Sequence, residues 1–390
     1  MTGLKKRSVE EVKALSREEA VEIMRQAGIL GAGGAGFPTY LKYKDPHPHL
    51  IVNATESEPG YQADKAVHKE YLTEFLLVYE ALKTIFDFEL VSMCVHEKDR
   101  EWYADYQEHA DGEADGGANG LYDVRYVPDG YSLGQEKILI RHATDAEVPW
   151  RVDMPDGSRR PGMPPDAGII VNNSETLLNV YNALFLGKPT TTKFLSVYGE
   201  DIDLKVYETP IGASVMEVLS IAGIDAGSSG RLSCTDGGPY LHRLAIEELG
   251  AGHDAYVRAT SNALFLLKKG TRGRDYAGVK TDAPEEGIVS LVGRVSGVQL
   301  PLGGRFLAPA GALVSKGDPV EYGRKIGEPV DEGLSVGVWS SMDGTVSSIK
   351  DGIVAINGGA VPRGEAEAET EAEATRPVEP QEEAEAEATR

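Results

Sequence analysis

The chain has 390 residues, 41% of them hydrophobic, which is enough for two or three globular domains. Its formal net charge of -23 at pH 7 excludes a nucleic-acid-binding surface, because backbone phosphates would be repelled. Two cysteines exclude a disulfide framework, and no apolar run reaches the roughly 18 residues of a membrane span, so we expect a cytoplasmic protein.

The first predicted element is an amphipathic helix over residues 16–29. Ser16 and Glu19 are placed to form a capping box at its start. Apolar residues then recur at helical spacing, at Ala20, Ile23, Met24 and Ala27.

A glycine-dense segment, GAGGAGFPTYLK at residues 31–42, follows this helix. A dinucleotide-binding fingerprint follows a strand, so this segment is not one. Its glycines still let backbone amides approach an anion, a proline suits the first turn of a helix, and a lysine adds positive charge. These residues are Gly31, Gly33, Gly34, Gly36, Pro38 and Lys42. Such a loop alone is most often a tight turn, and the Asn172–Asn173 pair after an apolar run favours a phosphate site.

The next segments alternate between strand and helix patterns. Apolar runs at 49–55, 90–97, 122–128 and 167–171 predict strands, and helices are predicted over 73–86 and from 132 to 144. This order predicts a parallel α/β sheet in a first domain over residues 16–188. Residues 107–120 are acidic and glycine-rich, which indicates a surface insertion.

Two β-rich regions and a tail follow. Residues 190–270 contain two strands over 193–212, a helix over 213–223 and a strand over 232–240, which predicts a small β-grasp-like domain. Residues 285–358 alternate short apolar strands with Gly- and Pro-rich turns, which predicts an all-β domain. The acidic tail, 363–390, is low-complexity sequence expected to be disordered.

Four motifs together resemble a known family. They are the glycine segment, NATESEPG at 53–60, LGQEKIL at 133–139 and VNNSETLLNV at 171–180. In this order they resemble the flavin-binding core of the NADH-oxidising flavoprotein of complex I, its counterpart in the Rnf complex (RnfC) and the flavoprotein cobalamin reductase. The resemblance continues to about residue 357, and the domain order is most similar to the cobalamin reductase. It implies an FMN-binding α/β domain, a soluble-ligand-binding (SLBB) β-grasp domain and a barrel-sandwich hybrid.

The resemblance also implies roles for individual residues. The glycine loop and Lys42 would hold the FMN phosphate. The helix opened by Gln135 and Glu136 would face the flavin ring, and Glu58 would lie beside the nicotinamide as the catalytic carboxylate. Phe37 matches an aromatic residue that stacks on adenine. The residues that would contact the flavin are Asn53, Glu56, Asn172, Asn173 and Thr176.

The sequence departs from the family pattern at several positions. Asp45 stands where an aromatic residue is expected, and Thr55 replaces an aspartate, so the dinucleotide site is the less secure part. Two cysteines cannot ligate the iron–sulfur clusters of the relatives, so no self-contained cluster is expected. The hairpin at residues 341–344 lacks the lysine of a biotinyl or lipoyl carrier, which favours a scaffold.

Two functions remain open at this point. The first is an FMN-dependent, NADH-oxidising electron-transfer protein that passes electrons to a partner iron–sulfur protein or a corrinoid. A position at the periphery of a membrane complex stays open for it. The alternative is a non-catalytic assembly or ligand-binding subunit that keeps the fold. The acidic charge likewise fits either adaptation to salt or a docking surface for a basic partner.

Overall fold

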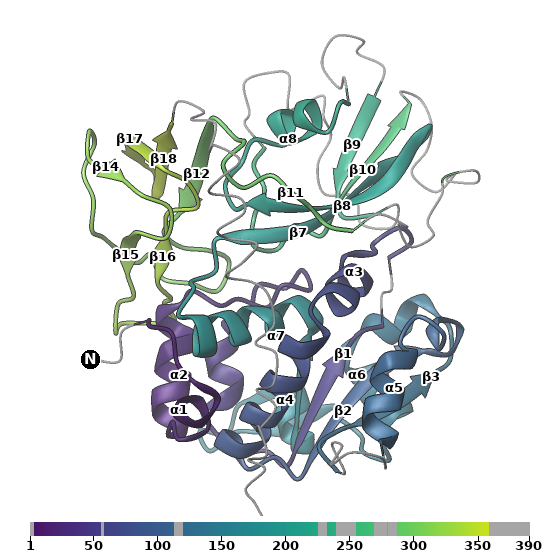
Figure 1. The fold of residues 1–390 in the computed structure, drawn as a ribbon. Helices are drawn as coiled ribbons and strands as arrows, with labels where there is room; N and C mark the ends of the chain where they lie inside the picture. Colours follow the sequence, from purple (N-terminus) through teal and green to yellow (C-terminus); the bar gives the residue numbers. More distant parts are fainter. Residues whose placement is uncertain are drawn as a thin grey trace, which may run out of the picture.

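The computed structural model describes residues 4–55, 58–112, 120–224, 232–238, 255–268, 279 and 287–358. An α/β domain carries a mixed β-sheet domain at one end, and a second β-rich domain lies beside both (Figure 1). The predicted fold class, a parallel α/β core followed by β-rich regions, is confirmed. The acidic tail and Glu56 lie outside the described residues.

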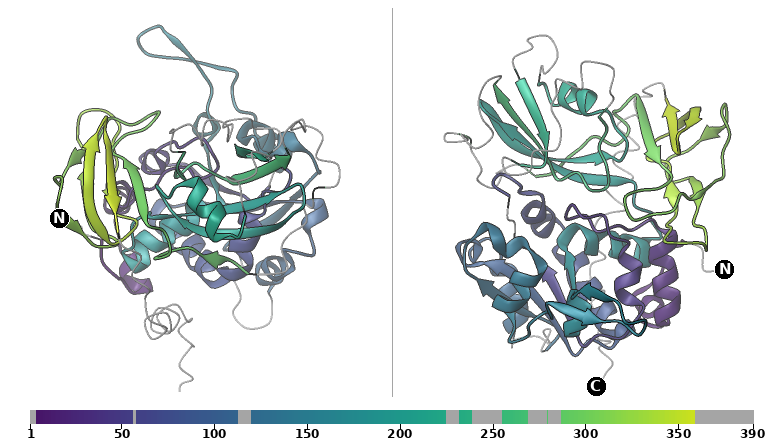
Figure 2. Two further views of the ribbon diagram at one scale, coloured as in Figure 1. Left: turned by 90° about the horizontal axis from the view of Figure 1, so that it is seen from above. Right: turned by 180° about the vertical axis from the view of Figure 1, so that it is seen from behind.

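Four parallel strands form the core of the first domain in the order β3-β2-β1-β6. All four predicted strands are present, and helical segments between them allow the parallel pairing. Their bounds are β1 (His49–Asn53), β2 (Leu90–His96), β3 (Asp123–Val127) and β6 (Ile169–Asn173). A separate two-stranded ribbon, β4 (Arg151–Asp153) with β5 (Arg159–Pro161), projects from this domain (Figure 2, left).

Helices cover both faces of this sheet. Those predicted at 16–29, 73–86 and 132–144 are present as α2, α4 and α6, and the capping box of Ser16 and Glu19 is formed. Helices α1, α3, α5 and α7 were not predicted, and α5 occupies part of the segment interpreted as an insertion. The remainder of that segment, 113–119, lies outside the described residues. The helices are α1 (Val9–Lys13), α2 (Arg17–Gln26), α3 (Ala63–Glu70), α4 (Leu72–Phe86), α5 (Ala104–Asp111), α6 (Glu136–Ala143) and α7 (Ser174–Tyr181), with short 3-10 turns η1 (Thr39–Tyr43), η2 (Glu97–Asp99), η3 (Tyr131–Gly134) and η4 (Pro164–Ala167) and a π-helical turn η5 (Asn182–Leu186).

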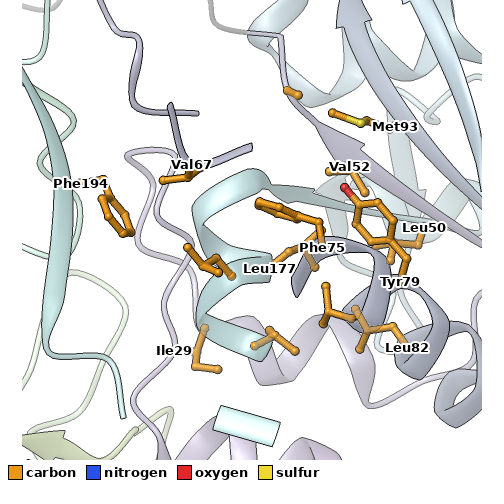
Figure 3. Packing of buried hydrophobic residues seen from close by; sticks show 14 of the residues in the cluster. Ile29, Leu50, Val52, Val67, Phe75, Tyr79, Leu82, Met93, Leu177 and Phe194 are labelled. Atoms are coloured by element: carbon orange, nitrogen blue, oxygen red, sulfur yellow. The ribbon is translucent and has the colours of Figure 1, made fainter. Parts of the chain in front are cut away.

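Side chains of the central strand alternate between two apolar layers. Leu50 and Val52 pack with residues of α4 and α7, and Figure 3 shows Phe75 and Leu177 in this cluster. Ile51 points to the opposite face and packs with residues of α6. Because both faces are covered by helices, a ligand is expected at an edge where the strands end.

The second domain is a five-stranded sheet in the order β11-β8-β7-β10-β9. The predicted two strands, helix and further strand are all present, with β10 added parallel to β7. The first strand of the region 285–358, which was predicted to belong to the third domain, is present as β11, but it pairs with β8 of this sheet. The elements are β7 (Thr192–Gly199), β8 (Ile202–Pro210), α8 (Val215–Ile221), β9 (Leu232–Asp236), β10 (Ala263–Lys268) and β11 (Val289–Ser290).

The third domain consists of two small sheets, β12-β18-β17-β14 and β13-β15-β16. The turn at residues 341–344 joins β16 to β17 and is partly buried: Ser341 is 1% exposed and donates to the Ile211 carbonyl at 2.6 Å, whereas Asp343 is exposed. The start of this turn therefore contacts the second domain, and the scaffold interpretation stays a prediction. The strands are β12 (Gly297–Pro301), β13 (Gly311–Ala312), β14 (Pro319–Val320), β15 (Lys325–Glu328), β16 (Val338–Trp339), β17 (Gly344–Lys350) and β18 (Ile353–Asn357).

Candidate functional site

The candidate site lies where β1 and β6 end side by side. Asn53 and Asn173, the last residues of these strands, are register partners. From β1 the chain adds β2 and then β3 on one side, and it returns with β6 on the other side. In parallel α/β sheets, ligands bind outside the carboxyl ends of the strands at such a change of direction. The sheet therefore brings together two motifs that are 120 residues apart in the sequence.

Asn53 anchors the loop that follows β1. Its Nδ2 donates to the Gly134 carbonyl at 3.3 Å, just before the start of α6. Its Oδ1 accepts the backbone N–H of Thr55 at 3.1 Å and lies 2.6 Å from Thr55 Oγ1. Thr55, which replaces the expected aspartate, is also 3.1 Å from the Leu133 carbonyl. Asn53 thus links the end of β1 to the turn that carries Gln135.

Asn173 and Thr176 tie α7 to the glycine loop. Asn173 is the N-cap of α7, where its Oδ1 accepts the Thr176 N–H at 3.3 Å. Thr176 Oγ1 in turn accepts the backbone N–H of Ala32 at 2.9 Å. A Cβ added at Gly33 would lie 3.4 Å from Asn173 Cβ, so the loop passes directly over the end of β6.

The glycine loop closes on itself and leaves a row of amides open. The Gly31 N–H donates to the Phe37 carbonyl at 2.8 Å, and the Gly36 N–H donates to the Gly31 carbonyl at 3.2 Å. Within the described chain, the amides of Gly33, Gly34 and Ala35 donate to no protein group. Gly33 and Ala35 are exposed, so this row can receive an anion. The proline at 38 precedes η1, a 3-10 turn and not the α-helix that was expected.

Lys42 lies at the same edge of the sheet but is engaged within the protein. Its Nζ donates to the Val171 carbonyl at 2.5 Å and to Glu136 Oε1 at 3.1 Å. Glu136 is the first residue of α6, and Gln135 is its N-cap, as the resemblance implied. Phosphate binding by Lys42 therefore requires the ammonium to be shared with, or released from, Glu136.

Asn172 contributes to the site through a buried contact with η1. Its side chain is 2% exposed and its Nδ2 donates to the Tyr43 hydroxyl in η1. Burial raises the pKa of Tyr43 well above its ordinary value, so this hydroxyl stays protonated. The Asn172 side chain thus fixes η1, and Asn173 is the member of the pair that faces the loop.

Three buried charged residues lie behind Asn173, and none of them was predicted from the sequence. Asp64 of α3 accepts from Asn173 Nδ2 at 3.0 and 2.8 Å through its two carboxylate oxygens. Lys193 of β7 forms a fully buried ion pair with Glu175 of α7. Burial raises the pKa of Asp64 to about 7, although Lys193 opposes the shift, and burial also raises the pKa of Glu175. No spacing in the sequence predicts this cluster, since its members come from three distant elements.

The second domain covers the loops that carry the predicted residues. Glu58 is 8% exposed, and its side chain fills the place that a Cβ at Gly238 would need, 2.0 Å from Cγ. The Gln62 N–H donates to Ser196 Oγ at 2.9 Å. Phe37, expected to stack on adenine, contacts Phe306 of the third domain with ring centroids 6.1 Å apart.

Two cavities lie away from this edge. One of about 370 Å³ is lined by residues 319–324, and one of about 190 Å³ lies at α3 and α5 beside His68 and Trp102. Neither is lined by a residue of the candidate site.

Comparisons with known proteins identify two domains of the chain. Residues 24–182 match the Nuo51 FMN-binding domain, and residues 278–362 match the RnfC barrel sandwich hybrid domain. The first range contains every residue of the predicted site. The chain thus carries an FMN-binding domain of this kind followed by an RnfC-type barrel, and the resemblance inferred from the sequence is confirmed.

Curated relatives are longer proteins. The C component of the ion-translocating oxidoreductase complex of Vibrio cholerae is 31% identical over 189 residues, 48% of this chain and 22% of the relative. The corresponding protein of Pseudomonas aeruginosa is 32% identical over 228 residues, 57% of this chain and 27% of the relative. Cobalamin reductase PduS of Salmonella typhimurium is 29% identical over 256 residues, 66% of this chain and 51% of the relative. The chain therefore spans between about a fifth and a half of their lengths.

A solved structure is also similar. The NAD+-reducing NiFe hydrogenase in its H2-reduced state matches 66% of this chain and 48% of that chain, with 20% identity and a TM-score of 0.49. Within the described residues, no helix is long and apolar enough to cross a membrane.

The residues at the sheet edge fit FMN. The nucleotide carries a phosphate, a chain of hydroxyls and an apolar ring system. The open amides of Gly33, Gly34 and Ala35 fit the phosphate, and Gly33 lies within contact distance of Asn173 at the end of β6. The start of α6 places a positive helix end at the same edge.

Proposed function

We propose that this chain is an FMN-dependent electron-transfer flavoprotein that accepts a hydride from NADH and passes electrons to a partner. The observation that carries the proposal is the convergence at one sheet edge of the glycine loop, Asn53 and Asn173, within a matched FMN-binding domain. When bound, FMN supplies two-electron hydride acceptance and one-electron release. The names of the relatives, a component of an ion-translocating oxidoreductase and a cobalamin reductase, support a redox role.

In this proposal the chain's own residues bind and orient the nucleotide. The amides of the glycine loop hold the phosphate, together with Lys42 once its ammonium is shared with Glu136. Asn173 is held in one orientation by Asp64 and Thr176, and Asn53 fixes the turn that leads into α6. The N-terminus of α6 adds positive potential, which favours a flavin that gains electrons.

The proposal also includes an electron donor, NADH, and an electron acceptor on a partner. Glu58 would act at the nicotinamide, and its burial against Gly238 keeps water away from the carboxylate. The acceptor would be an iron–sulfur protein or a corrinoid, because two cysteines do not provide cluster ligands within these residues.

Visible absorption tests the proposal directly. Purified protein, reconstituted with FMN, should show flavin bands near 370 and 450 nm, about the values of flavoproteins generally. Excess NADH under anaerobic conditions should bleach the band near 450 nm, by general flavin chemistry. Glu58→Gln should keep the FMN content and slow the bleaching. A protein that refuses added FMN would refute the flavoprotein proposal, and bound flavin that NADH fails to bleach would refute NADH as donor.

One observation favours a second candidate, a non-catalytic assembly or ligand-binding subunit. The Lys42 ammonium is occupied by Glu136 and Val171, and the Asn172 amide by Tyr43, so two polar groups expected to face FMN serve the fold instead. The same reconstitution experiment distinguishes the candidates, because a non-catalytic scaffold would not take up FMN.

A further inference from the structure

Residues 258–262 of the second domain form a turn, directly before β10, that several hydrogen bonds hold in place. The Asp236 carboxylate accepts from the Arg258 guanidinium at 2.8 Å and from Ser261 Oγ at 2.9 Å. Ser261 Oγ also accepts the Arg258 N–H at 3.1 Å, and the Asn262 carbonyl accepts the Ser196 N–H at 3.2 Å. Asp236 is 7% exposed and Ser261 2% exposed, whereas the Arg258 side chain is 45% exposed, so the buried carboxylate and hydroxyl hold the turn in one shape.

This turn lies directly on the glycine loop of the first domain. A Cβ at Gly36 would lie 2.8 Å from Thr260 Cγ2, closer than atoms can approach without a shift. A Cβ at Gly34 would lie 3.6 Å from Asn262 Nδ2. The Asn262 side chain is therefore adjacent to the loop whose amides at residues 33–35 are open.

The side-chain carbonyl of Asn262 lacks a partner. Its Oδ1 is buried and accepts no hydrogen bond from any residue that the structure describes. A buried acceptor without a donor is costly, so such groups are normally paired in the functional state. The neighbouring loop offers donors that suit an anion, and Asn262 adds an acceptor that suits a hydroxyl. A phosphate attached to a chain of hydroxyls satisfies both.

We infer that Asn262 is a nucleotide-binding residue contributed by the second domain, and that its Oδ1 accepts a hydrogen bond from a hydroxyl of the ribityl chain. The inference rests on the proposed function, because it takes FMN as the occupant of the edge. It assigns the second domain a direct part in the site. The ligand is then held between the glycine loop and the 258–262 turn, and its binding links the two domains.

Flavin binding by Asn262 variants tests this inference. FMN and riboflavin are titrated into the apoprotein, and dissociation constants are read from quenching of flavin fluorescence. Asn262→Ala should weaken both ligands by about five- to tenfold, the value of one hydrogen bond, because riboflavin keeps the hydroxyls. Asn262→Asp keeps the acceptor but adds a charge, so it should weaken FMN more than riboflavin.

Asn357→Ala serves as the matched control, because Asn357 is an exposed asparagine of β18. It should leave both dissociation constants unchanged. Asn262→Ser is added in case the alanine variant unfolds, and thermal melting of every variant confirms folding. Folded Asn262 variants that bind both flavins within twofold of wild type would overturn the inference and leave the proposed function intact. A wild-type chain that binds no FMN would refute both the inference and the proposed function.

Discussion

Among single residues, Asp64 connects the candidate site to the second domain. Its carboxylate holds the Asn173 amide, and it lies in the field of the Lys193–Glu175 ion pair. Tyr61 adds a weaker contact at 3.4 Å. The single Lys193 ammonium cannot neutralise both the Asp64 and the Glu175 carboxylate when the two acids are ionised. Folding therefore favours the protonated form of Asp64 near neutral pH.

Asp64→Asn should change how stability depends on pH. The pKa of Asp64 is raised in the folded state from 3.8 to about 7, so the unfolded chain releases this proton first. Protonated Asp64 contributes fully to the stability of the folded state below about pH 4. This contribution is lost as the pH rises through about 7. The variant should therefore gain about 2 to 3 kcal/mol relative to wild type between pH 5 and pH 8. Urea denaturation at the two pH values measures the difference.

Asp99→Asn is the control for this measurement, because Asp99 is also a buried aspartate, 2.8 Å from Lys65. Its variant should show no comparable gain at pH 8. A pH dependence of stability that is the same for Asp64→Asn and wild type would contradict the account of Asp64.

Lys42→Ala should weaken FMN binding. A charge-assisted contact with the phosphate contributes about 1 to 3 kcal/mol, of which the competing Glu136 takes a part. Glu136→Gln should then strengthen binding by freeing the ammonium. Lys44→Ala, a neighbouring exposed lysine, is the control and should have no effect. Equal FMN affinity for Lys42→Ala and wild type would remove Lys42 from the phosphate site.

At the level of elements, the glycine loop is shaped by its contacts on both sides. Thr176 of α7 holds the start of the loop, and Thr260 of the second domain closes over its end. Gly34 and Gly36 adopt left-handed conformations, with φ of 107° and 68°. The loop is therefore built for close approach as well as for its turn.

Gly36→Ala should destabilise the protein through two separable effects. The left-handed backbone costs about 1 to 2 kcal/mol for a residue with a Cβ, and contact with Thr260 adds about 1 to 3 kcal/mol. Gly352→Ala isolates the first effect, because Gly352 has φ of 76° and nothing within 4 Å of the added carbon. In urea denaturation, Gly36→Ala should lose clearly more stability than Gly352→Ala, and adding Thr260→Ser should recover part of it. Equal losses for the two alanine variants would contradict the close contact.

Over the whole molecule, the two cysteines occupy separate apolar cores. Cys94 lies in β2 and Cys234 in β9, and both are buried. Burial raises the pKa of both thiols, to about 12 for Cys94, so neither is a ready thiolate ligand. Electrons that reach the flavin would have to leave for a partner.

Metal analysis of anaerobically purified protein should find no stoichiometric iron. The reason is the number of cysteines together with the burial of both thiols. The flavin content of the same sample is the internal control for cofactor loss. About one cluster per chain would contradict the expectation and would require ligands shared between protomers.

Local signals were sufficient for much of the first domain. The capping box at Ser16, the alternation of apolar runs and the four motifs predicted three of its helices (α2, α4 and α6), its parallel strands and the FMN-binding domain. These features depend on neighbours within a few residues or on recognisable motifs, so they can be read along the chain.

Contacts between distant segments were decided by the folded chain. The register that pairs Asn53 with Asn173, the Asp64 contact behind it, and the second-domain turn over Gly36 each join residues more than 100 positions apart. The side chains of Lys42 and Asn172 also took partners, Glu136 and Tyr43, that no spacing indicates. Burial sets these pairings, because a polar group removed from water must find a donor or acceptor wherever the packing of helices and sheets places one.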